Sequence, residues 1–226
     1  MTVPEIMTTL RQDIVRVPKI MHEAPGLKVL GHTIHTLLFS TDVALIRNTD
    51  ADGVIAVYPF TPHPAIIQAI CQVADIPVFA GIGGGLTSGK RSADIGLLAE
   101  ANGAIGMVVN APTTLRTVQM IKKTVDSPLV LSVVAVDQEI DAFLEAGVAL
   151  VNVSGGRHTP EIVARLRRQY PDLPIIATGG PTDDSIRATL AAGANVLTYT
   201  PPTNGELFRH KMDQYRNQIA KNSKSE

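Results

Sequence analysis

The hydrophobic and polar positions of the chain follow a repeating pattern. A stretch with helical periodicity ends in a glycine and is followed by a short apolar run rich in β-branched residues. Glycine is common where a helix ends because it adopts a positive φ at little cost. The apolar runs are nearly continuous, which is typical of parallel strands covered on both faces. The pattern predicts strands at residues 54–57, 104–109, 148–153 and 194–199.

Three further strands are predicted where an apolar run begins beside a proline. Proline is tolerated at the first residue of a strand because its missing N–H is not needed there. Counted together, seven strands after residue 50 begin at intervals of roughly 20 to 30 residues, which is the period of a βα unit. The proline-flanked runs are residues 76–80, 127–134 and 173–178, and helical patterns cover residues 65–74, 113–125 and 160–170.

The first unit is less regular than the others. The apolar run at residues 14–20 is predicted as the first strand, and residues 28–32 compete for the same place. Alternating βα units form a parallel sheet with right-handed crossovers, and eight units over about 200 residues fit a closed barrel. The sequence therefore predicts a single (β/α)8 (TIM) barrel over residues 1–219, followed by a polar tail at 220–226. An open doubly wound sheet is the alternative.

Composition and charge narrow the class of protein. With 20 basic and 21 acidic residues, the formal net charge is −1, which gives no electrostatic basis for binding nucleic acid or an anionic membrane. The single Cys71 excludes an internal disulfide and a cysteine-cluster metal site, and it fits a reducing compartment. Neither a secretory signal nor an apolar run of about 20 residues is visible. We therefore expect a soluble, cytoplasmic protein.

Candidate catalytic residues come from the carboxyl ends of the predicted strands, where the active sites of such barrels form. Lys19 would end the first strand, where partial desolvation would suit it to a Schiff base, proton transfer or carboxylate binding. Alternatively, its stem packs while its ammonium group reaches solvent. Four candidates are thus Lys19, His63, Asn110 and Asn152; His158, after the sixth strand, is a further candidate for binding or acid–base chemistry.

Glycine-rich loops at the same rim predict an anion site. Their N–H groups can approach a phosphate or carboxylate next to a helix N-terminus, and loops seven and eight commonly form the phosphate site of a barrel. The alternative is that the glycines serve only tight turns. In the long loop 81–91, Lys90 either reaches an anionic substrate or belongs to a solvated basic turn. The candidate anion-binding residues are Gly155, Gly156, Arg157, Thr178, Gly179, Gly180, Thr182, Thr200 and Lys90.

The later units resemble a known superfamily. Residues 177–180, Ala-Thr-Gly-Gly, followed by residues 191–196, Ala-Ala-Gly-Ala-Asn-Val, are similar to the corresponding part of the ribulose-phosphate-binding barrels. That superfamily includes phosphosugar epimerases, phosphosugar aldolases and enzymes like orotidine-phosphate decarboxylase. The resemblance covers the βα pattern of residues 50–205. It implies a phosphate bound at Gly179 and Gly180.

Other positions depart from that superfamily. Its eighth loop usually supplies glycine with serine or threonine, whereas residues 200–203 read Thr-Pro-Pro-Thr, and proline has no N–H to donate. The sixth strand lacks the Schiff-base lysine of the aldolases, and the third lacks the Asp-x-Lys-x-x-Asp array of the decarboxylases. The resemblance therefore implies the phosphate site and none of the named activities. Residues 153–157, with residues 178–180, are also similar to the later strands of FMN-dependent barrels.

From these observations we expect an enzyme that acts on a small phosphorylated or carboxylated metabolite. The reaction would be of the lyase, isomerase or hydrolase type and would need neither a cofactor nor a metal ion. One alternative is an FMN-binding oxidoreductase, and another is a metabolite sensor that has kept the barrel and lost the chemistry. The expected partner is a small anionic metabolite rather than nucleic acid or a membrane, and a homo-oligomer is compatible with a barrel of this size.

Overall fold

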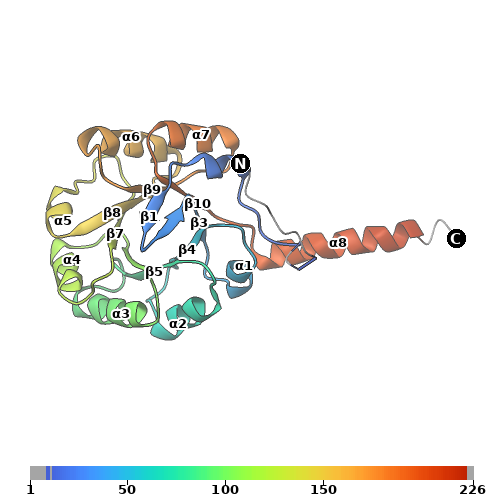
Figure 1. The fold of residues 1–226 in the computed structure, drawn as a ribbon, viewed down its shortest axis with the longest axis horizontal. Coiled ribbons are helices and arrows are strands. Elements are labelled where there is room, and N and C mark those ends of the chain that lie inside the picture. Colours follow the sequence, from blue (N-terminus) through green and yellow to red (C-terminus); the bar gives the residue numbers. More distant parts are fainter. Residues whose placement is uncertain (1–8, 11, 223–226) are drawn as a thin grey trace.

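The centre of the molecule is a closed barrel of parallel strands (Figure 1), seen in a computed structural model that describes residues 9–10 and 12–222. Its eight strands are β3 (Thr36–Phe39), β4 (Gly53–Ala56), β5 (Val78–Gly83), β6 (Gly106–Val109), β7 (Leu129–Val133), β8 (Val148–Val153), β9 (Ile175–Thr178) and β10 (Val196–Tyr199). Each pairs with the next in this order, and β10 pairs with β3 to close the ring. The predicted (β/α)8 barrel is confirmed, and the open sheet is wrong.

Helices cover the outside of this barrel (Figure 1), and all seven strands predicted after residue 50 are present. Three of the predicted glycine joints, Gly103, Gly147 and Gly193, have a positive φ next to the end of a helix. The helices around the ring are α1 (Val43–Arg47), α2 (Pro64–Val73), α3 (Gly89–Ala101), α4 (Leu115–Lys122), α5 (Asp141–Glu145), α6 (Thr159–Gln169) and α7 (Asp183–Ala191).

The first barrel strand is not where the sequence pattern put it. Both predicted segments, residues 14–20 and residues 28–32, are wrong, because the barrel begins with β3. Residues 14–20 run outside the barrel, where Val15 forms a single bridge with Thr49. Residues 28–32 fall in a separate hairpin of β1 (Leu27–Val29) and β2 (His32–Ile34).

This hairpin closes the amino-terminal end of the barrel. In Figure 1 it lies at the centre of the ring of helices, and its buried residues Val29 and Ile34 share a cluster with the inward-facing side chains of the barrel. Leu30 and Gly31 both have a positive φ, which suits the tight two-residue turn between β1 and β2. The hairpin, residues 27–34, therefore closes the barrel to water at its amino-terminal end, and we call it the plug.

A single carboxylate fixes the start of β3 above the plug. Oδ2 of Asp52 accepts hydrogen bonds from the N–H groups of His35 and Thr36, at 2.8 and 3.0 Å, and from Oγ1 of Thr36 at 3.2 Å. Charge-assisted hydrogen bonds of this kind are stronger than neutral ones. They satisfy the backbone between β2 and β3, so the chain can turn from the plug into the barrel.

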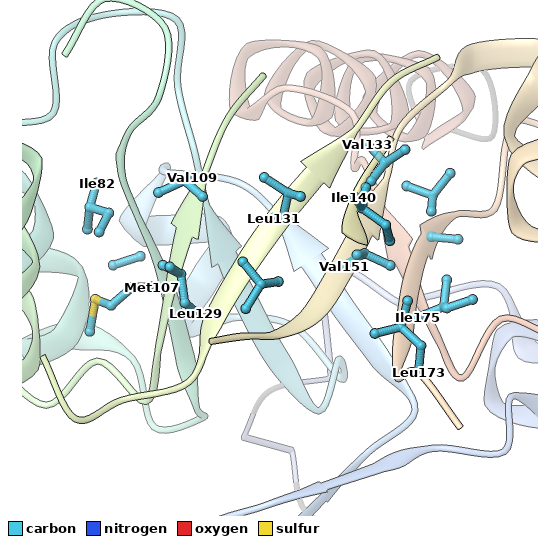
Figure 2. Close-up of a cluster of buried hydrophobic side chains, with 14 of the residues drawn as sticks. Ile82, Met107, Val109, Leu129, Leu131, Val133, Ile140, Val151, Leu173 and Ile175 are labelled. Atoms are coloured by element: carbon cyan, nitrogen blue, oxygen red, sulfur yellow. The ribbon is translucent and has the colours of Figure 1, made fainter. Parts of the chain in front are cut away.

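Side chains alternate between the inside and the outside of the barrel along each strand. On β7, Leu129, Leu131 and Val133 face outward into a cluster shared with the surrounding helices (Figure 2), while Val130 faces inward. This period of two follows from the geometry of an extended chain. It decides which residues can reach the carboxyl-terminal mouth of the barrel.

The final helix, α8 (Asn204–Asn222), leaves the ring and extends away from it (Figure 1). It continues three residues past the predicted domain end at 219, and residues 223–226 of the predicted tail lie outside the described part of the chain. Among the described helices, none combines the length and the apolar character needed to cross a membrane.

We predict that Ile34→Ala lowers the free energy of unfolding by about 2–4 kcal/mol, because the change opens a cavity between the plug and the barrel. Denaturant unfolding monitored by circular dichroism would measure it. Thr33→Ala on the exposed face of the same strand is the matched control and should cost less than about 0.5 kcal/mol. Equal losses for the two variants would contradict the plug.

Candidate functional site

Five polar side chains form one layer inside the carboxyl-terminal mouth of the barrel. Each stands two residues after an inward-facing apolar residue of β6 to β10, the set Val108, Val130, Leu150, Ile176 and Val196. The alternation along a strand therefore directs all five to the interior. We call them the polar layer: Asn110, Ser132, Asn152, Thr178 and Thr198.

Hydrogen bonds run along this layer from strand to strand. Ser132 Oγ donates to Asn110 Oδ1 at 3.3 Å, and Thr198 Oγ1 donates to Thr178 Oγ1 at 3.4 Å. Thr178 Oγ1 is 3.5 Å from Oγ of Ser154, just beyond the end of β8. These are long bonds between neutral groups, and hydroxyls can rotate to serve another partner. The layer can therefore turn several donors and acceptors toward a ligand.

Asn152 is a buried member of the layer whose side-chain oxygen is unpaired. The residue is 7% exposed, and its Oδ1 has no hydrogen-bond partner among the described residues. A buried polar atom without a partner costs about 1–3 kcal/mol of stability. Such a cost at the mouth of a barrel is typical of a side chain retained for binding rather than for folding.

The opposite side of the mouth is apolar. The equivalent positions at the ends of β3, β4 and β5 are Phe39, Val57 and Gly81. A cavity of about 170 Å³ lies on this side, and Asn110 joins it to the polar layer. Its other lining residues are Val57, Tyr58, Pro59, Phe60, Pro62, Gly81, Gly83, Gly85, Leu86, Thr87 and Ala111.

Glycines at the end of β5 and directly after it hold Asn110 in place. A Cβ on Gly84, whose φ is +120°, would lie 2.0 Å from the carbonyl oxygen of Asn110. Gly83 accepts a hydrogen bond from the N–H of Asn110 at 2.8 Å, and Gly84 donates to the carbonyl of Thr87 at 2.7 Å. Loop 81–91 therefore packs its backbone directly against the end of β6. Its glycines permit this close approach.

The loop after β9 offers backbone donors. Within the described part of the chain, no hydrogen bond outside the strand ladder uses the N–H group of Gly179 or of Gly180. Thr182 caps α7 in a reciprocal arrangement with Ser185, so its hydroxyl already accepts a bond from the Ser185 N–H. Asp183 adds a carboxylate to the same first turn. The donors for an anion here are the two glycine N–H groups rather than the helix end.

Arg157 and His158 form a polar cluster after β8. Arg157 Nε donates to Nε2 of His158 at 3.1 Å, and Nδ1 of His158 lies 3.2 Å from Oε2 of Glu161. Gly155 uses its N–H within the loop, since it donates to Thr159 Oγ1 at 3.1 Å. Gly156 has a φ of +58°. This cluster is exposed, so the guanidinium of Arg157 can turn toward an anion.

His63 and Lys90 have local partners at the rim. Nδ1 of His63 accepts from the N–H of Ala65 at 3.2 Å and so caps α2, as its position before Pro64 allows. Nζ of Lys90 lies 2.8 Å from both carboxylate oxygens of Asp94. Thr200 is exposed after β10. The functional roles proposed for these three residues stay predictions.

Lys19 does not stand at the mouth. It begins a short 3-10 turn, η1 (Lys19–Glu23), and its side chain is exposed. The segments on either side bind to the amino-terminal side of the barrel, where Val17 donates to Asp50 Oδ1 and Gly26 donates to the carbonyl of Asn195, both at 2.8 Å. The prediction of a partly desolvated lysine at the end of a barrel strand is wrong, because residues 14–20 do not enter the barrel.

Three residues of the site were not among the candidates selected from the sequence: Ser132, Ser154 and Thr198. Each was visible at a strand end, but a single serine or threonine there is common and carries no motif. The signal that could have selected Ser132 and Thr198 is their spacing from the inward apolar residue two positions earlier. Gln138 was also missed; it holds the loop after β7 by donating to the carbonyl of Ser132 at 3.1 Å.

Comparison with known proteins supports the fold. No family model matches the chain, and neither does the sequence of any curated protein. Among solved structures, a phosphoenolpyruvate phosphomutase from Streptomyces platensis subsp. rosaceus is 15% identical, with a TM-score of 0.61 over 90% of this chain and 86% of that one. A 2,3-dimethylmalate lyase is 10% identical, with a TM-score of 0.61 over 83% and 82%. A phosphonopyruvate hydrolase bound to oxalate and Mg²⁺ is 16% identical, with a TM-score of 0.58 over 82% and 81%.

At these identities the likeness concerns the fold alone. The lyase is described as a member of the PEP mutase/isocitrate lyase superfamily. The comparison therefore agrees with a barrel of the broad kind that the sequence indicated. It does not support the more specific resemblance to the ribulose-phosphate-binding barrels.

The described side chains of this chain include no group of three that could bind an ion such as the Mg²⁺ of the hydrolase. Among the residues that the structure describes, no three His, Cys, Asp or Glu side chains gather in a way that could hold a metal ion. The polar layer consists of amides and hydroxyls, which are weak ligands for Mg²⁺ without a carboxylate. The described residues therefore do not fit the metal.

We predict that Gly84→Ala lowers the free energy of unfolding by about 2 kcal/mol or more and displaces Asn110, because the new Cβ collides with backbone and strains a positive φ. Thermal unfolding, with the crystal structure of the variant, would measure both. Gly85→Ala is the matched control: no atom lies within 4 Å of its Cβ position. Equal stability of the two variants would contradict the close packing of Gly84 against Asn110.

Proposed function

We propose that the mouth of the barrel binds a small metabolite through a phosphate or carboxylate group and that the chain is an enzyme of the lyase, isomerase or hydrolase type. The observation that carries this proposal is the polar layer itself, a set of buried and half-buried amides and hydroxyls inside a mainly apolar barrel. Sites for small molecules combine an apolar surface with a few convergent polar groups. The apolar cavity beside Asn110 and the polar layer fit that description.

The anionic group of the ligand would bind at the ends of β8, β9 and β10. There the N–H groups of Gly179 and Gly180 adjoin the hydroxyls of Thr178 and Thr198. Bonds from N–H and O–H donors to a charged acceptor are worth more than bonds between neutral groups. Arg157 would supply the positive charge that this set of neutral donors lacks.

The rest of the ligand would lie over Asn110, Ser132 and Asn152. Neutral donors aimed at one place stabilise negative charge that develops on an oxygen during a reaction, and they need no reorganisation to do so. The named activities of the structural neighbours concern small carboxylated or phosphorylated acids, which supports this choice of substrate class. No single activity among them is assigned to this chain.

His158 is the acid–base group that the arrangement favours. Glu161 holds its Nδ1, while its Nε2 accepts from Arg157. If Arg157 turns to an anion, Nε2 becomes available to exchange a proton with the ligand, and the carboxylate keeps the ring oriented. A histidine oriented by a carboxylate in this way is suited to general acid–base catalysis.

The direct test is binding of inorganic phosphate and of oxalate, measured by isothermal titration calorimetry. Thr178→Val and Thr198→Val should each weaken binding at least 10-fold, because each removes a hydroxyl that donates to a charged acceptor. Thr124→Val, in the turn after α4 and far from the mouth, is the matched control and should bind as the wild type does. Equal affinity in all four proteins would refute the site, and binding without turnover of any phosphorylated or carboxylated acid would favour the sensor.

A second prediction concerns Asn152. Asn152→Leu should raise the free energy of unfolding by about 1 kcal/mol, because it removes a buried acceptor that has no partner. The same change should weaken ligand binding at least 10-fold. Denaturant unfolding and calorimetry on one preparation would measure both effects. A loss of stability would show instead that Asn152 serves the fold.

A further inference from the structure

The cavity beside Asn110 differs in chemistry from the polar layer next to it. Its volume is about 170 Å³, and none of the described residues that line it carries a charge. An apolar cavity of roughly 150 Å³ is large enough for a benzene ring. The space therefore fits a side group of up to about six carbon atoms. A charged group would find no counterion among the lining residues and would lose its hydration.

Two apolar side chains that line this cavity are exposed to solvent. Phe60, in the loop after β4, is 73% exposed, and Leu86, in the loop after β5, is 80% exposed. Single exposed apolar residues are common on protein surfaces, but these two come from neighbouring loops and line one cavity. An apolar side group of a ligand would remove part of both surfaces from water, which favours binding.

The wall formed by the loop after β4 is already fixed in the protein alone. The hydroxyl of Tyr58 accepts a hydrogen bond from the N–H of His63 at 2.7 Å, which ties the two ends of the loop together. Pro59 and Pro62 restrict the backbone between them because their φ angles are fixed. A cavity with preformed walls loses less conformational entropy when a ligand enters.

Thr87 lines the same cavity and has an unused hydroxyl. The residue is 3% exposed, and its Oγ1 has no hydrogen-bond partner among the described residues. Its carbonyl, in contrast, accepts from the N–H of Gly84 at 2.7 Å and from Oγ of Ser92 at 3.0 Å. The backbone of Thr87 is therefore held in place while the hydroxyl remains unpaired. Rotation about χ1 can direct that hydroxyl into the cavity.

Packing alone gives no reason for a threonine at this position. Valine has nearly the same shape and would remove a buried hydroxyl that has no partner, so it would fill the space at lower cost. The same reasoning applies to Asn152 in the polar layer. Thr87 thus provides a second unpaired polar atom at the mouth, on the side of the apolar cavity.

We propose that the cavity receives an uncharged, mainly apolar side group of the substrate that carries one hydroxyl or carbonyl oxygen, and that Thr87 selects this oxygen. This inference rests on the proposed function, since it names the class of acid that the mouth would bind. The anionic group would lie at Gly179 and Gly180. Asn110, which belongs to the polar layer and also lines the cavity, would lie between the two ends of the substrate.

The first test compares four 2-hydroxy acids by isothermal titration calorimetry: lactate, 2-hydroxy-4-methylpentanoate, 2,4-dihydroxy-4-methylpentanoate and 2-hydroxyglutarate. The 4-methylpentanoate should bind at least about 10-fold tighter than lactate, because its additional carbon atoms leave water. It should also bind at least about 10-fold tighter than 2-hydroxyglutarate, whose second carboxylate would be buried without a partner.

Two kinds of failure are distinguishable in this series. Equal affinities for the four acids, or binding of inorganic phosphate and of none of the acids, would overturn this inference and leave the proposed anion site standing. Absence of binding for phosphate and for all four acids would refute the proposed function as well.

The second test concerns the hydroxyl of Thr87. Thr87→Val should weaken binding of the 2,4-dihydroxy acid at least about 10-fold, because it removes the partner of the 4-hydroxyl group. The same variant should bind 2-hydroxy-4-methylpentanoate as tightly as the wild type or more tightly. Thr124→Val is again the control and should leave both affinities unchanged. An equal loss for both acids in Thr87→Val would show that the residue serves the loop, and would overturn its role in selection.

A third test leaves the buried residues intact. Leu86→Ala should reduce the preference for 2-hydroxy-4-methylpentanoate over lactate at least about 3-fold, because it removes part of the apolar wall. Leu97→Ala, which changes an exposed leucine on α3 that does not line the cavity, is the matched control. An unchanged preference in Leu86→Ala would show that the side group binds elsewhere.

Discussion

The alternation of side chains along eight parallel strands is the constraint on which this molecule depends. Once the barrel closes, every second residue faces a narrow interior, and the strands share one direction, so equivalent positions form layers. One layer is apolar and rests on the β1–β2 plug. The next layer toward the mouth holds Asn110, Ser132, Asn152, Thr178 and Thr198. Fold and candidate site thus arise from the same period of two.

The cost of that polar layer explains how the surrounding loops are built. Polar atoms inside a barrel must be paired, and the layer satisfies them only in part, with long bonds between hydroxyls and an unpaired atom on Asn152. The loop after β5 can press its backbone on Asn110 because Gly84 has no Cβ. In the loop after β7, the side chain of Gln138 holds the end of that strand by donating to the carbonyl of Ser132. The loops therefore fix side chains of the polar layer whose own hydrogen bonds are long or incomplete.

Sequence patterns were sufficient for the repeating part of the fold. From residue 50 onward each strand is a local apolar run, so its type could be predicted without tertiary information. The amino-terminal part could not, because residues 14–20 have the same β-branched character as a strand and yet pack outside the barrel. The four residues of β3 directly follow the β1–β2 hairpin, and nothing in the sequence alone marks where the hairpin ends and the barrel begins. Lys19 was lost as a candidate for the same reason.

The site was predictable in part. Asn110, Asn152, Thr178 and the pair Gly179–Gly180 follow directly from strand ends, and all lie at the mouth. Ser132 and Thr198 required the register of neighbouring strands, which a single sequence does not contain. The course of α8 away from the ring was equally hidden, because an amphipathic pattern predicts a helix but not the direction in which it leaves the barrel.

The central claim is that the mouth beside Gly179 and Gly180 receives the anionic group of a small metabolite. It is tested most directly by titrating inorganic phosphate into ¹⁵N-labelled protein and following the amide resonances. We expect saturable shifts at Gly179, Gly180, Thr178 and Thr198, with little change at residues of the plug. Shifts confined to exposed basic residues such as Lys90, or no saturable shift at any residue of the mouth, would contradict it.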